Sequence, residues 1–237
     1  MQPTAKASYK STLTRLYART AALFLPTVVQ LDLENFRYYA IQDALYLTDF
    51  AYCLRKLGSN PNIDGADSER LNELARGAEE DEKELHRSFF QKWEIDASGA
   101  TAMPNTLMYT SYMIRVVTTR CYAEGLAVLL PCFWVYMHVG KCMLKLREEL
   151  GVTVSRCPQF DAWIDMYAGE AFESEVRGYI AMVDVVAKQA DGETLQNMEK
   201  HFLMSCKLEH MFWDQAKDLM QWPDIEGSVG KHEDDKK

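Results

Sequence analysis

A helical spacing of apolar residues runs through almost the whole chain, and this pattern restricts the possible fold more than any other feature. Apolar side chains recur three and four positions apart, whereas the alternation typical of a half-buried strand is scarce. The pattern predicts a single all-α domain without internal repeats. The expected helices lie near 5–25, 33–57, 67–92, 104–149 with at least one break, 158–189 and 192–221.

The expected helix ends carry residues that commonly start or stop helices. Asp32 is placed to cap the helix that follows it, and Gly58 is expected to end that helix. Asp67 or Ser68 is expected to cap the next helix. Pro104 occupies a first-turn position, where a missing backbone N–H costs nothing.

Length and composition fit one helical domain and exclude several kinds of partner. The chain has 237 residues, of which 48% are hydrophobic, so it can bury a sizeable core. We expect a domain at 1–226 and a polar tail at 227–237. The net charge of −9 is opposite to that expected for binding nucleic acid or an anionic membrane. The richest apolar run, 126–139, is 14 residues long, shorter than the roughly 20 that a membrane span needs.

Cysteine usage and the N-terminal sequence favour a cytoplasmic protein. The six cysteines are scattered without a CxxC pair, which is typical of reduced thiols. The apolar run at 21–29 contains Pro26 and lacks a clear cleavage site, so it is a poor signal peptide.

Two carboxylates interrupt otherwise apolar helix faces. Asp43 lies within an aromatic face of the second expected helix, and Glu209 lies in the middle of such a face on the last one. A buried carboxylate must be paired, hydrogen-bonded or protonated. Either one alone could be structural, but two on separate helices suggest a polar cavity within the bundle. Core packing is the better explanation for any one tyrosine on two further stripes, but together these tyrosines would line the cavity: Tyr109, Tyr112 and Tyr167.

Cys132 follows a proline within the longest apolar run. A proline inside a helix removes one backbone hydrogen bond and kinks the helix. If the helix restarts at Pro131, Cys132 lies in its first turn, where free amides and the helix dipole favour a thiolate. We therefore expect Cys132 to be alkylated before the other five thiols. The alternative is a buried cysteine that packs as a small apolar residue.

Other catalytic patterns are missing from the sequence. It has no GxSxG, GxGxxG, phosphate-loop or HExxH motif, and no Glu three residues before a His as in a di-iron site. The acidic stretch 64–86 is predicted to be a solvated helix face, and its Glu82 and His86 a surface pair. No metal and no other cofactor is expected.

Five segments, in order, resemble the TenA family, also called thiaminase II or aminopyrimidine aminohydrolase. They are Phe36–Leu47, Tyr109–Met113, Leu129–Tyr136, Trp163–Tyr167 and Glu209–Trp213. Any one of them is a weak signal, but five in order from about residue 30 to 216 are specific.

The resemblance implies a haem-oxygenase-like all-α fold and a homotetramer. It implies hydrolysis of aminomethylpyrimidine, and of thiamin, to hydroxymethylpyrimidine in thiamin salvage. Cys132 places the sequence in the Cys-containing branch of the family. The implied catalytic residues are Cys132, Glu209 and Asp43. The implied substrate-binding residues are Tyr46, Tyr109, Tyr136, Tyr167 and Phe212.

These residue types suit attack on an aminopyrimidine ring. Desolvation would raise the pKa of Glu209, so that it can protonate a ring nitrogen while the Cys132 sulfur adds to the ring. Two alternatives remain open. A silent pyrimidine-binding protein would not need the intact catalytic set, and a haem-oxygenase-like oxidase would need a cavity-facing His that none of the predicted site positions provides.

Overall fold

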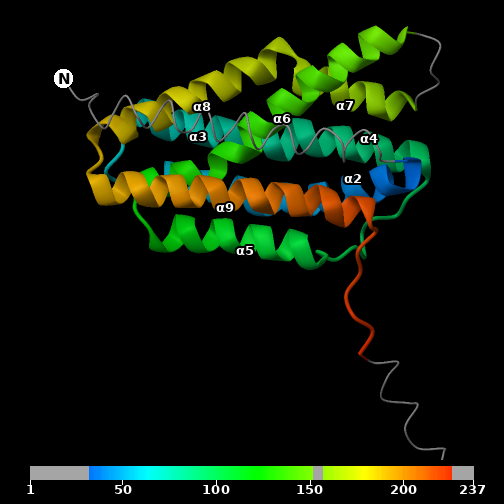
Figure 1. The fold of residues 1–237 in the computed structure, drawn as a ribbon, viewed down its shortest axis with the longest axis horizontal. Helices are drawn as coiled ribbons and strands as arrows, with labels where there is room; N and C mark the ends of the chain where they lie inside the picture. Colours follow the sequence, from blue (N-terminus) through cyan, green and yellow to red (C-terminus); the bar gives the residue numbers. More distant parts are fainter. Residues whose placement is uncertain (1–31, 152–156, 226–237) are drawn as a thin grey trace, which may run out of the picture.

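The computed structural model describes residues 32–151 and 157–225, and every regular element in these ranges is a helix (Figure 1). The all-α prediction is therefore confirmed for the described residues. The expected helix near 5–25 and the tail at 227–237 lie outside them. The helices are α2 (Leu33–Gly58), α3 (Gly65–Gly77), the π-helix η1 (Ala78–Glu82), α4 (Lys83–Trp93), α5 (Pro104–Thr119), α6 (Tyr122–Leu150), α7 (Pro158–Ala168), α8 (Glu170–Gln189) and α9 (Gly192–Lys217).

Most of the predicted helix ends are confirmed. The Asp32 carboxylate accepts hydrogen bonds from the second and third amides of α2, and Gly58 is the last residue of that helix. Pro104 is the first residue of α5. The cap predicted at Asp67 or Ser68 is wrong, because Asp64 already accepts a bond from the Asp67 amide at 2.8 Å and starts α3 earlier.

The break in the run 104–149 lies at Cys121, not at the proline. Arg120 and Cys121 are extended, so they separate α5 from α6. Pro131 lies inside α6, which continues on both sides of it. The lost hydrogen bond costs about 3 kcal/mol, and the extensive burial along α6 offsets that cost. Cys132 is consequently in mid-helix, and the predicted first-turn setting is wrong.

Helices α6 and α2 organise the core. Helix α6 packs against α5, α7, α8 and α9, and α2 packs against α3, α4, α5 and α9. By length and composition α6 is apolar enough to cross a membrane, but 72% of its most apolar window is buried inside the protein. Its apolar character is thus explained by its central position.

A glycine lets α7 approach α6 closely. A Cβ atom added at Gly140 would lie 2.7 Å from the carbonyl carbon of Tyr167, which is backbone and cannot rotate away. The contact places the end of α7, and with it the Tyr167 side chain, against the middle of the bundle.

Candidate active site

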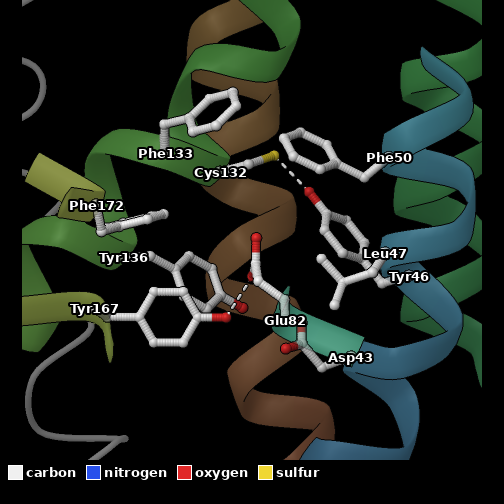
Figure 2. A pocket seen from close by; sticks show the side chains of 10 residues that line it. All are labelled: Asp43, Tyr46, Leu47, Phe50, Glu82, Cys132, Phe133, Tyr136, Tyr167 and Phe172. Carbon is white, nitrogen blue, oxygen red and sulfur yellow. Dashed lines mark hydrogen bonds between the residues drawn. The ribbon is translucent and has the colours of Figure 1, made fainter. Parts of the chain in front are cut away.

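A pocket lies where α2, η1 and α6 meet the end of α7 and the start of α8. Figure 2 shows that its wall combines a sulfur, two carboxylates and several aromatic rings. Five of the eight site residues predicted from the sequence line it. The lining residues are Asp43, Tyr46, Leu47, Phe50, Glu82, Cys132, Phe133, Tyr136, Tyr167 and Phe172.

Cys132 lies in the pocket wall with two phenol groups beside its sulfur. Its side chain is buried, and its Sγ contacts the hydroxyls of Tyr46 and, at 3.1 Å, Tyr109. Burial raises the pKa of the Cys132 thiol well above its usual value, and the nearby Glu209 raises it further. The predicted resting thiolate is therefore wrong: the thiol is protonated until a base removes its proton.

Tyr109 connects this thiol to Glu209. Its hydroxyl donates to Glu209 Oε1 at 2.8 Å. A phenol has only one hydrogen to donate, so in its contact with Cys132 the Tyr109 oxygen is the acceptor and the thiol the donor. The result is a directed chain from Cys132 through Tyr109 to Glu209.

Glu209 is protonated at neutral pH. It is 1% exposed, and burial raises the pKa of its carboxyl from 4.5 to about 8, although the hydrogen bond from Tyr109 counteracts part of the rise. The raised pKa predicted from the sequence is confirmed. Glu209 is not among the residues that line the pocket, and Tyr109 connects it to Cys132, which does line it.

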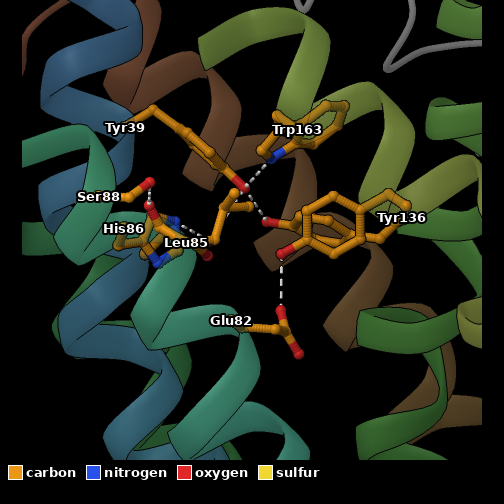
Figure 3. A network of polar contacts seen from close by, with 9 residues as sticks. Tyr39, Glu82, Leu85, His86, Ser88, Tyr136 and Trp163 are labelled. Atoms are coloured by element: carbon orange, nitrogen blue, oxygen red, sulfur yellow. Dashed lines mark hydrogen bonds and ion pairs between the residues drawn. The ribbon is translucent and has the colours of Figure 1, made fainter. Parts of the chain in front are cut away.

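Asp43 lines the pocket and is held by two partners. The Tyr39 hydroxyl donates to Asp43 Oδ2 at 3.1 Å, and His86 Nε2 lies 3.2 Å from the same oxygen. Figure 3 shows Tyr39 on α2 and His86 on α4, the helices that provide these two partners. The predicted buried carboxylate is confirmed, and its partners are a hydroxyl and an imidazole.

The remaining predicted aromatic residues divide into two groups. The Tyr136 hydroxyl lies 3.2 Å from that of Tyr39, and the Tyr167 hydroxyl donates to Glu82 Oε2 at 2.6 Å; both tyrosines line the pocket. Phe212 packs against the Tyr46 ring, with the centroids 5.7 Å apart, and does not line the pocket. It supports the wall from behind.

The prediction that Glu82 and His86 form a surface pair is wrong. Glu82 lines the pocket, and His86 is 1% exposed. The signal for His86 was present in the sequence, because Phe89, Phe90 and Trp93 follow it at helical spacing. The sequence held no such signal for Glu82, because Glu82 ends a π-helix whose wider turn shifts the helix faces.

Among residues 32–151 and 157–225, no three or more His, Cys, Asp or Glu side chains are arranged to hold a metal ion. The oxidase alternative would use such a ligand set. The described residues that line the pocket supply a thiol, two carboxyl groups and phenols.

Comparison with known proteins gives consistent similarities. Residues 29–219 match the family model described as the TENA/THI-4/PQQC family. The aminopyrimidine aminohydrolase of Bacillus subtilis is 33% identical over 197 residues, which cover 82% of this chain and 80% of that one. The enzyme of the same name from Halalkalibacterium halodurans is 31% identical, with coverages of 81% and 84%.

A solved structure shares the fold. The TenA homologue from P. horikoshii OT3 superposes with a TM-score of 0.77 and covers 89% of this chain and 98% of its own, at 23% sequence identity. The similarity supports the all-α TenA-type architecture expected from the sequence.

Proposed function

Because the chain belongs to the TENA/THI-4/PQQC family, we propose that it is a hydrolase that converts aminomethylpyrimidine, and thiamin, to hydroxymethylpyrimidine. The observation that carries the proposal is the chain of hydrogen bonds from Cys132 through Tyr109 to Glu209 beside the pocket. It joins a nucleophile to a neutral acid, and attack on an aminopyrimidine requires both.

The first step of the proposed reaction forms a carbon–sulfur bond. Glu209 gives its proton to a ring nitrogen, and the Cys132 sulfur adds to a ring carbon. The thiol proton passes to Tyr109, which passes its own proton to the Glu209 carboxylate. Proton transfer along hydrogen bonds already made needs no side-chain movement, and the acid returns to its neutral form.

The second half of the reaction exchanges the leaving group for water. The exocyclic C–N bond breaks, and its electron pair leaves with ammonia, or with the thiazole when thiamin is the substrate. Water then adds to the methylene carbon, and Asp43 accepts the proton that water loses and releases it to the departing ammonia or to solvent. The C–S bond breaks last: the sulfur regains its proton from Glu209 through Tyr109, and Glu209 recovers the ring proton.

The test is ammonia release from aminomethylpyrimidine, measured for the wild type and for Cys132→Ala. We expect steady release by the wild type and none by the variant, with circular dichroism showing that both are folded. A wild type that binds the pyrimidine without turnover would support the silent-binder alternative. Unchanged turnover in the variant would refute the covalent step.

We also propose a homotetramer located in the cytoplasm and acting in thiamin salvage. All six cysteines are free thiols in the structure, which suits a reducing compartment. Light scattering is expected to give about four times the chain mass of 27.2 kDa. A mass near that of one chain would contradict the tetramer.

A further inference from the structure

Glu82 is the pocket carboxylate that the proposed reaction leaves without a role. It is the last residue of η1, the five-residue π-helix between α3 and α4. Figure 2 shows its carboxylate directed into the pocket, between the Tyr167 ring and the Cys132 side. Isolated π-helical turns are rare and often lie at functional sites.

A rigid neighbour orients the Glu82 carboxylate. The Tyr167 hydroxyl donates to its Oε2 at 2.6 Å (Figure 2). Burial, followed by the charge of Glu82, raises the pKa of Tyr167 well above its usual value, so this phenol stays a neutral donor. Tyr167 is itself held by the Trp163 ring, 4.8 Å away between centroids, and by the close approach at Gly140.

The charge balance of the pocket favours a cation. Among its described lining residues two are acidic, and none is Lys, Arg or His. Asp43 is buried, and His86 lies 3.2 Å from its carboxylate. Glu82 is half-buried, and it accepts a hydrogen bond from the Tyr167 hydroxyl.

The pocket also has two chemically different sides. The thiol of Cys132 lies with Phe50 and Phe133, which suit a flat ring, whereas Glu82 lies with Tyr136 and Tyr167. A pyrimidine bound against the sulfur would direct a short substituent towards the oxygen-rich side.

We propose that Glu82 binds the positively charged exocyclic amine of the substrate and thereby selects pyrimidines with a cationic leaving group. The inference rests on the proposed function and assigns a residue to its leaving-group subsite. An alkyl ammonium is charged at neutral pH, and a carboxylate offers it charge-assisted hydrogen bonds. The hydroxymethyl product is neutral, so it lacks this attraction and is released more readily.

The experiment compares the binding of two ligands that differ only in this substituent. Titration calorimetry on a Cys132→Ala background, which prevents turnover, would measure aminomethylpyrimidine and hydroxymethylpyrimidine with and without Glu82→Gln. Glutamine keeps an oxygen that accepts from Tyr167, so the local structure is retained. We expect aminomethylpyrimidine to bind roughly 10- to 100-fold more weakly, and hydroxymethylpyrimidine to bind within about twofold of the background.

Glu80→Gln is the matched control, because it removes the same charge from the same π-helix at an exposed position. It should change neither affinity. Equal weakening of both ligands by Glu82→Gln, or no weakening, would overturn the inference.

The same variants without the Cys132 change separate this inference from the proposed function. If the wild type releases no ammonia from aminomethylpyrimidine, both fail together. If the wild type does release ammonia and Glu82→Gln leaves KM for that substrate unchanged, the Glu82 inference alone fails.

Discussion

Replacing Glu209 by Gln should make the protein more stable and much less active in the same pH range. Glu209 is 1% exposed, and burial raises the pKa of its carboxyl from 4.5 to about 8. The glutamine has nearly the same shape and still accepts the hydrogen bond from Tyr109. It cannot give a proton to a ring nitrogen or take one back.

The stability change follows from proton linkage. Because the folded-state pKa is raised, the stabilisation by the neutral carboxyl is complete below pH 4.5 and is lost as the pH rises through about 8. Each pH unit in this window removes about 1.4 kcal/mol from the free energy of unfolding, or ~5 kcal/mol across it. A glutamine side chain does not ionise, so the free energy of unfolding of the variant should increasingly exceed that of the wild type as the pH rises. At pH 8 the Tm of the variant should be higher by on the order of 10 °C.

The activity change has the opposite sign. Loss of a general acid typically lowers kcat by roughly 10²- to 10⁴-fold, and substrate binding should weaken far less. In the wild type, kcat/KM should fall about tenfold per pH unit above about pH 8, where Glu209 loses its proton.

The assay combines ammonia release with thermal unfolding of both proteins at pH 5 and pH 8. Near-normal turnover of folded Glu209→Gln would refute the acid role. A variant that is less stable than the wild type by the same amount at both pH values would show that Glu209 instead serves to hold α9 in place.

Three further results are expected. Tyr109→Phe should lower kcat about 100-fold or more, because it breaks the proton path from Cys132 to Glu209, and it should leave the circular dichroism spectrum unchanged. A variant whose single-turnover rate equals that of the wild type would contradict this path. Gly140→Ala should destabilise the fold by roughly 1–3 kcal/mol through its clash with the Tyr167 backbone, and urea unfolding with an unchanged midpoint would show that no such clash exists. Mass spectrometry after brief alkylation should find exposed Cys121 modified before Cys132, whose thiol is buried and protonated. If Cys132 were modified first, the prediction that it rests as a thiolate would be supported instead.

Much of the site was accessible from the sequence because helical periodicity is a local property. Asp43 and Glu209 interrupt apolar faces, and a residue on such a face is buried wherever the helix packs. The raised pKa of Glu209 follows from that burial alone. The cap at Asp32 and the end at Gly58 are equally local, since each depends on a few neighbouring backbone groups.

Only the tertiary structure decided how the pocket is completed and in what state its thiol rests. Pro131 remains inside α6 because packing on several sides outweighs one lost hydrogen bond, and Cys132 is therefore buried and protonated. Glu82 reaches the pocket through a π-helical turn that has no sequence signature, and His86 becomes a partner of Asp43 only when α4 packs against α2. These features depend on contacts between helices far apart in the chain, which local spacing does not encode.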